Sequence, residues 1–222
     1  MADHIPEDAL MREINEELRE EQMHKLWKRY GSFIIGVAVS VVVIVAGYQG
    51  WRTYTTSVRM SESEILYNAE MAAKNGDTNA ALSQLGNLGE DGKSGYKVLA
   101  QFQQAALLAK GSDSNAAAII YQEITEDTSN DSGTRGLALV LGALQELKIA
   151  GNNRDELKKR LNTANSDNNP WRHSVREILA LLEIESGNKE NAKKIFAILG
   201  NDSQAPDGIR SRAQKILSVL GS

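Results

Sequence analysis

The chain has 222 residues, a formal net charge of −4 and no cysteine. The lack of thiols excludes disulfides, thiolate metal sites and cysteine nucleophiles. Acidic and basic residues nearly balance, at 29 against 25. The chain therefore lacks the excess positive charge with which nucleic-acid-binding proteins hold phosphates, and we expect no nucleic-acid partner.

Residues 1–29 form an acidic leader, for which we predict an exposed helix on the cytosolic side of a membrane. Glu16, Glu17, Glu20 and Glu21 occupy its polar side, and its apolar residues form two short stripes that point in different directions. This pattern fits a solvated helix that leads into the membrane. It also fits a docking segment for a cytoplasmic or membrane partner.

Residues 30–51, YGSFIIGVAVSVVVIVAGYQGW, form an uncharged stretch bounded by Arg29 and Arg52. A helix of this length extends roughly 33 Å, slightly more than the hydrocarbon core of a bilayer. Aromatic residues stand at both of its ends, where amphipathic rings settle at headgroup depth: Trp27, Tyr30, Tyr48 and Trp51. We predict a transmembrane helix in preference to a buried core helix of a soluble protein.

The flanks of this stretch favour an uncleaved signal anchor whose N-terminus lies in the cytoplasm. The leader is long and acid-rich, unlike the short positive region that begins a cleaved signal peptide. Lysines and arginines are more numerous before the stretch than after it: Lys25, Lys28 and Arg29 against Arg52 and Arg59. The remainder of the chain is then exported.

Small residues follow one side of the predicted membrane helix: Gly36, Ser40, Gly47 and Gly50. Small side chains allow a second helix to approach closely within a membrane. This side is therefore a candidate helix-contact face. The alternative is that glycine and serine are simply tolerated at these positions.

Residues 52–222 contain helical stretches that end repeatedly at a glycine followed by a polar residue: Gly76-Asp77, Gly111-Ser112, Gly151-Asn152 and Gly187-Asn188. Five or six residues after each glycine comes a small or apolar residue: Ala81, Ala117, Leu157 and Ala192. The spacing is close to the roughly 34 residues of the tetratricopeptide repeat, a helix–turn–helix unit. Glycine supplies the positive φ that stops each first helix.

The first helix of such a unit also needs a small residue where the two helices cross. Ala69 and Ala180 stand seven residues before their glycines, but Gln104 and Leu144 occupy the same place in the second and third units. The repeats are therefore degenerate.

The predicted fold is all-α, with one N-terminal transmembrane helix followed by a tetratricopeptide-like α-solenoid of about four degenerate helix pairs. A last helix, Ile209–Leu220, has the pattern of the terminal cap that covers the open end of a solenoid. The predicted domains are residues 1–29, 30–51 and 52–222.

Stacked helix pairs offer an extended surface that suits peptides and helices. We expect the first helix of each pair to line it, which gives residues 94–110 and 136–149. Phe102, Gln103 and Gln145 are candidate groove residues. Each of them also fits a core or plain surface position.

No motif for catalysis, metal binding or cofactor binding is present. His4, His24 and His173 form no metal-ligand spacing, and only His173 lies on the exported side. We therefore expect no enzyme activity, no cofactor, no metal and no small-molecule substrate. A hydrolase with an unrecognised site remains the alternative from another functional class.

Residues 16–31, EELREEQMHKLWKRYG, the exit GYQGW and the helical tail resemble the YfgM-like family of ancillary SecYEG translocon subunits. The ending PDGIRSRAQKIL is similar to the alphaproteobacterial branch. The resemblance implies a single-span bacterial inner-membrane protein whose helical domain lies in the periplasm. It implies association with the translocon, with a PpiD-type periplasmic chaperone and with exported polypeptides. A scaffold for another envelope assembly, such as cytochrome maturation or cell-wall synthesis, is the alternative.

The orientation can be tested by protease accessibility. External protease added to intact spheroplasts should degrade residues 52–222 and leave the leader protected, because the basic flank retains the N-terminus inside. A tag at each end, followed by immunoblotting, reports which part survives. A tail that resists external protease until the cells are lysed contradicts the predicted orientation.

Overall fold

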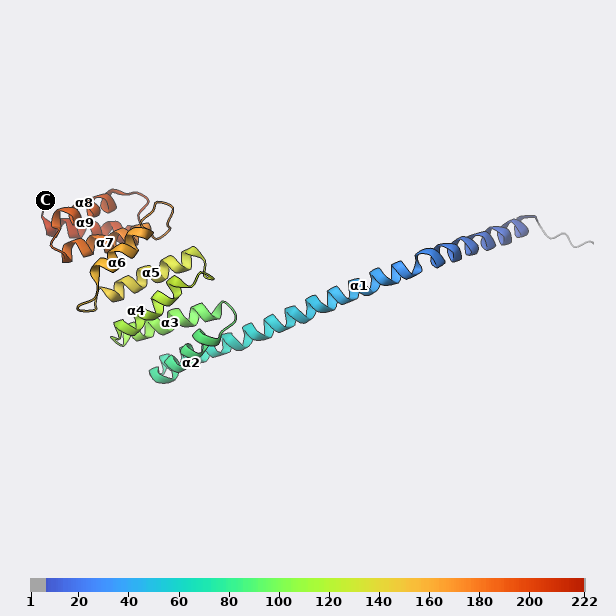
Figure 1. Cartoon of the computed structure of the whole chain (residues 1–222), viewed down its shortest axis with the longest axis horizontal. Coiled ribbons are helices and arrows are strands. Elements are labelled where there is room, and N and C mark those ends of the chain that lie inside the picture. The colour runs from blue at the N-terminus through green and yellow to red at the C-terminus, as the bar shows by residue number, and fades with distance from the viewer. Residues whose placement is uncertain (1–6, 222) are drawn as a thin grey trace, which may run out of the picture. The chain divides into compact units, whose positions relative to one another are not determined.

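The computed structural model describes residues 7–221, and within that range it consists of helices and short connections without a strand (Figure 1). Side chains are described from residue 16 onward. Residues 1–6 of the predicted leader and Ser222 lie outside the described part. The prediction of an all-α chain is confirmed.

Nine helices are described between residues 7 and 221. Their bounds are α1 Glu7–Lys74, α2 Thr78–Asp91, α3 Tyr96–Lys110, α4 Ser114–Glu126, α5 Ser132–Glu146, α6 Arg154–Ala164, α7 Arg172–Glu185, α8 Lys189–Asn201 and α9 Asp207–Leu220. The chain divides into two units, Met1–Ser57 and Val58–Ser222, and α1 contributes residues to both.

Within the first unit, α1 contains the one stretch among the described helices that is long and apolar enough to cross a membrane. Its large apolar side chains are exposed, with Phe33 at 70% and Ile44 at 69%. Side chains of this kind need an apolar environment, and the described residues do not provide one here. The division of the chain into residues 1–29, 30–51 and 52–222 stays a prediction.

Within the second unit, successive helices pack as antiparallel pairs. The end of α1 pairs with α2, α3 with α4, α5 with α6, and α7 with α8, and α6 also packs on α7. The four predicted pairs are therefore present. Four clusters of buried apolar residues follow one another along the unit, and the largest fully buried side chain is Phe196 of α8.

The turn inside each pair reverses the chain at one residue with positive φ. That residue is Gly76 in the first pair, at 86°, and Gly187 in the fourth, at 82°. In the second pair it is Ser112, at 68°, whereas Gly111 has a φ of −76°. The expectation that Gly111 supplies the positive φ is therefore wrong by one position.

The same shift explains the register of the small residues at the helix crossings. Three pairs of alanines are fully buried: Ala69 with Ala81, Ala105 with Ala117, and Ala180 with Ala192. The first alanine of each pair lies seven residues before the positive-φ residue, and the second lies five residues after it. Counted from Ser112 instead of Gly111, the second unit therefore follows the same rule, and Ala105 rather than Gln104 occupies the crossing.

The third pair departs from this register because its turn is longer. Gly151 has a φ of 75°, but α6 begins only after the N-cap Asn153. Ala143 is buried, whereas Leu144, which stands seven residues before the glycine, is 38% exposed. Leu157 of α6 is fully buried where the other second helices have alanine.

The last helix, α9, covers α8 at the end of the unit. Its Ile209 and Ala213 share a buried cluster with Phe196 and Leu199 of α8. The helix begins at Asp207, two residues before the predicted start, after Pro206 in extended conformation. The predicted capping helix is thus present.

Ser112 offers a test of the turn geometry. A residue with a side chain pays a conformational penalty in the left-handed region that glycine does not. Ser112→Gly should therefore stabilise the protein by about 1 kcal/mol, which raises Tm by roughly 2–4 °C for a unit of this size. Thermal unfolding followed by circular dichroism measures the shift. Ser112→Ala, which keeps the penalty, is the control, and an equal gain from both substitutions contradicts the explanation.

Candidate functional site

The candidate helix-contact face of α1 is open along the described part of the chain. A Cβ atom built at Gly36, Gly47 or Gly50 would meet no atom of the described residues within 4 Å, apart from the neighbouring helix backbone. The Ser40 hydroxyl donates a hydrogen bond to the Gly36 carbonyl at 2.8 Å, so it is already satisfied within the helix. Contact with a second helix at this face stays a prediction.

The candidate groove residues occupy different environments. Phe102 of α3 is half-buried, and its ring centroid lies 6.0 Å from that of Tyr121 of α4. Gln103 is also half-buried. Gln145 is only 9% exposed, and its Oε1 accepts hydrogen bonds from Ser114 Oγ at 3.3 Å and Lys148 Nζ at 3.1 Å. The structure therefore uses Phe102 and Gln145 in packing between helices, and their role in binding stays a prediction.

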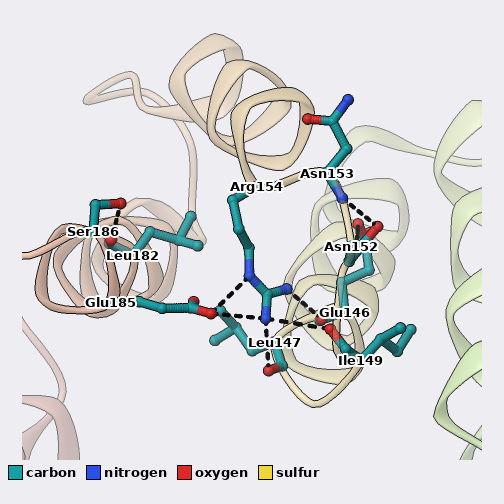
Figure 2. Close-up of polar contacts among 9 residues, drawn as sticks. All are labelled: Glu146, Leu147, Ile149, Asn152, Asn153, Arg154, Leu182, Glu185 and Ser186. Carbon is teal, nitrogen blue, oxygen red and sulfur yellow. Dashed lines mark hydrogen bonds and ion pairs between the residues drawn. The ribbon is translucent and has the colours of Figure 1, made fainter.

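A polar junction joins α5, α6 and α7 around Arg154, the first residue of α6 (Figure 2). Its guanidinium donates from Nη1 to the Glu146 carbonyl at 2.6 Å and from Nη2 to the Leu147 carbonyl at 3.1 Å. Nη2 also reaches the Ile149 carbonyl at 3.4 Å, and Nε donates to Glu185 Oε1 at 3.0 Å. The final carbonyls of a helix lack partners within it. Arg154 thus caps α5 and ties it to α7.

Buried carboxylates reinforce this junction. Both oxygens of Glu146 accept from Arg160 Nη2, at 2.7 and 2.6 Å, and one of them also accepts from Asn152 Nδ2 at 2.9 Å. Glu183 of α7 is buried and pairs with Lys158 of α6. The pKa of Glu183 lies below its ordinary value of 4.5, chiefly because Lys158 donates a hydrogen bond to its carboxylate.

A second buried carboxylate fixes the start of the helical unit. Glu62 of α1 accepts hydrogen bonds from the backbone N–H of Lys93, at 2.6 Å, and from the Ser94 hydroxyl. Burial alone would raise the pKa of Glu62. The hydrogen bonds from Lys93 and Ser94 together lower the pKa by more than burial raises it, so the pKa lies below its ordinary value. The side chain therefore anchors the connection between α2 and α3 to α1.

A cleft of about 610 Å³ opens between α4, α5, α6 and the connection from α6 to α7. Leu139 and Gly136 of α5 form part of its apolar wall. Trp171 packs so closely on Gly136 that a Cβ there would lie 2.5 Å from the ring. The indole N–H of Trp171 donates to the Gly133 carbonyl at 2.8 Å, which fixes the ring beside α5.

The polar side chains of this cleft include two cations. Arg160 is committed to Glu146. Arg135 forms no side-chain hydrogen bond or ion pair with the described residues, although its Nε is buried. Glu126 stands at the same cleft and accepts from Gln122 Nε2 at 2.8 Å.

His173 has a packing role in this structure. It is buried at the start of α7, and its Nε2 lies 2.9 Å from Asp202 Oδ2 in the connection between α8 and α9. No group of three or more metal-binding side chains occurs among the described residues.

Sequence reasoning missed both Arg154 and Arg135. The partners of Arg154 lie at the end of α5 and, across 31 positions, at Glu185. A cap from one helix onto another has no periodic signature. An arginine without a partner looks like any surface arginine in a sequence, so only the burial of its Nε distinguishes Arg135.

Comparison with known protein families finds a match to a family described as a tetratricopeptide repeat-like domain, over residues 24–206. The match begins before the uncharged stretch and ends immediately before α9. Comparison with curated proteins and with solved structures finds no significant match.

Two substitutions in the polar junction should destabilise the protein by different amounts. Arg154→Ala should lower the free energy of unfolding by about 2 kcal/mol, because three carbonyls lose a charged donor. Glu185→Gln should cost under about 1 kcal/mol, since the Glu185 side chain is about half exposed. Chemical denaturation followed by circular dichroism measures both effects.

Lys159→Ala is the matched control for this series, because Lys159 is an exposed cation of the same helix. It should change stability by no more than about 0.5 kcal/mol. Equal losses for Arg154→Ala and Lys159→Ala would show that the cap on α5 contributes nothing.

Proposed function

This chain belongs to the tetratricopeptide repeat-like domain family, and from that premise we propose that it is a membrane-anchored protein-interaction module. Domains of this family typically mediate protein–protein interaction and are not enzymes. The observation that carries the proposal is the run of four helix pairs, three of them with paired buried alanines, behind one long apolar helix.

The anchor is residues 30–51 of α1. Its exposed apolar side chains and its aromatic ends suit a bilayer. The family match starts at residue 24, so the matched region contains both the apolar stretch and the repeats.

The proposed location is the bacterial inner membrane, with a single span, a cytoplasmic N-terminus and a periplasmic helical domain. The greater number of basic residues before the span supports this orientation. The absence of cysteine is compatible with an oxidising compartment.

The proposed partners are subunits of the SecYEG translocon, a PpiD-type periplasmic chaperone and exported polypeptides. Support comes from the resemblance of the span's flanks to the YfgM-like family. The mechanism is recruitment, because an anchor beside the exit site raises the local concentration of the binding surface without new contacts. Gly36, Ser40, Gly47 and Gly50 supply the proposed face for a partner helix in the membrane.

Within the helical unit, the proposed binding surface follows the first helices of the pairs. Gln103 of α3 is half-buried and forms no side-chain hydrogen bond with the described residues, so its amide is available to a partner. Leu99 of the same helix is 49% exposed and offers apolar area nearby. Phe102 and Gln145 support this surface from the packed side.

Crosslinking in living cells tests the proposal. The full-length chain, tagged at its C-terminus, is crosslinked, solubilised in mild detergent and purified, and its partners are identified by mass spectrometry. Enrichment of Sec translocon subunits and a periplasmic chaperone is expected. Recovery of cytochrome-maturation or cell-wall enzymes instead supports the scaffold alternative, and no enrichment of any envelope protein contradicts the interaction module.

A matched control separates the contribution of the anchor. Replacing residues 30–51 with an unrelated transmembrane helix of equal length keeps the chain in the membrane but removes the small-residue face. Translocon subunits should be recovered less efficiently with this variant, whereas partners that bind the helical unit should be retained.

A further inference from the structure

We propose that Asn75, in the turn between α1 and α2, is a site of spontaneous deamidation, and that its products loosen the first helix pair. Asparagine is among the thermally labile residues of proteins. The reaction uses water as its co-reactant and the backbone nitrogen of Gly76 as its nucleophile. It is a chemical modification of the chain and goes beyond the proposed interaction function.

The reaction takes place between the Asn75 side chain and the peptide bond that follows it. The Gly76 nitrogen gives its proton to a base and attacks the side-chain carbonyl carbon, Cγ. A new C–N bond closes a succinimide ring, and the side-chain amide nitrogen takes up a proton and leaves as ammonia. Water then opens the ring at one of its two carbonyls. One opening gives aspartate, and the other gives isoaspartate, in which the side-chain methylene has become part of the main chain.

The first argument is the residue that follows Asn75. Glycine has no Cβ to hinder approach to its backbone nitrogen, and Asn75-Gly76 is the one Asn-Gly pair in the sequence. A Cβ built at Gly76 would meet no atom within 4 Å, apart from the two neighbouring residues, so the space around this glycine is open. The Asp91-Gly92 pair could form the same ring but is crowded, because a Cβ at Gly92 would lie 2.5 Å from the Leu88 carbonyl oxygen.

The second argument is the freedom of the two reacting groups. The Asn75 side chain is exposed and forms no hydrogen bond with the described residues. The Gly76 N–H donates to the Ala73 carbonyl at 3.2 Å, at the long end of the range for such bonds. The next N–H, that of Asp77, donates to the Ala72 carbonyl at 2.9 Å. The Gly76 nitrogen can therefore leave its acceptor while the shorter bond still closes the turn.

The third argument is that the other turns lack this pair of residues. The residue before the positive-φ position is Gly111 in the second turn, Ala150 in the third and Ser186 in the fourth. Asn188 follows the glycine of the fourth turn instead of preceding it, and a lysine comes next. Its Nδ2 donates to Glu183 Oε2 at 3.0 Å, so its side chain is held by a partner.

Either product changes the turn that sets the first helix crossing. The new carboxylate lies at the C-terminal end of α1, where the helix dipole disfavours negative charge. Lys74, the preceding residue, is already paired with Glu70 at 2.8 Å. Isoaspartate also adds one atom to the main chain between Ala69 and Ala81, which are both fully buried. Because this turn holds the two alanines in register, we expect the modified pair to pack less closely.

Isotope labelling tests the proposal on the full-length chain in mild detergent. The protein is aged in heavy-oxygen water at mildly alkaline pH, digested and analysed by mass spectrometry. Opening of the ring by water introduces one heavy oxygen atom, and we expect this label at Asn75 roughly tenfold faster than at Asn188, because glycine does not hinder the attack. Fragmentation should find isoaspartate as well as aspartate at this position, whereas direct hydrolysis without a ring gives aspartate alone.

Two variants test the position and the turn. Asn75→Gln should not become labelled there, because glutamine would have to close a larger ring. Ser186→Asn places an amide before Gly187, whose φ is 82°, and should become labelled at a rate similar to that of Asn75. Thermal unfolding then compares fresh with aged protein. The aged chain should unfold at a lower temperature than the fresh chain, and aged Asn75→Gln should show no such shift.

Equal labelling of Asn75 and Asn188 overturns the proposal, as does aspartate without isoaspartate at the first of these positions. An aged chain that contains isoaspartate there and unfolds at the same temperature as the fresh chain contradicts the effect on the first pair. A folded Ser186→Asn chain that stays unlabelled contradicts the role of the turn. If that variant does not fold, the comparison of Asn75 with Asn188 in the unmodified chain still decides.

Discussion

The close crossing of two helices at paired alanines is the contact on which the helical unit depends. In three pairs these alanines are fully buried, as in Ala105 with Ala117. Protein interiors are packed too densely to accept a larger side chain at such a point without moving the backbone. A single positive-φ residue in each turn holds the two alanines opposite one another. The turn and the crossing therefore form one constraint. It is visible in the sequence both as the residue in the turn and as the small residues at a fixed distance on either side of it.

These two sequence signals explain which parts of the fold could be predicted. The helix pairs, the final capping helix and the burial of Ala69, Ala81, Ala180 and Ala192 follow from glycine turns and helical spacing. Ser112 shows why the second unit was misplaced by one residue. In the second pair the left-handed residue stands directly before the N-cap of α4, and glycine is only the commonest residue for such a position. Asp113 provides that cap by accepting from the Ala116 N–H at 3.0 Å.

The polar junction could not be predicted for a different reason. Arg154 contacts α7 and the end of α5 only because the chain folds back through a long turn. Local rules for helix ends concern residues of the same helix or its flanks. A cap supplied by the first residue of the next helix depends on tertiary structure, as does the isolation of Arg135. The polar contacts between helices therefore could not be predicted from the sequence, whereas the helix pairs could.

The third helix pair, α5 with α6, has both an irregular turn and the polar junction. Among the helices of the repeat unit, α6 is polar, with Leu157 and Leu161 as its buried apolar residues, and it packs more extensively on α7 than on α5. A helix with so little apolar area is held in place partly by ion pairs, here through Arg154, Lys158 and Arg160. The cleft of about 610 Å³ lies beside this pair, lined by residues of α4, α5, α6 and the connection from α6 to α7. The regular pairs are held by crossings at buried alanines, whereas the irregular pair depends more on polar contacts between helices.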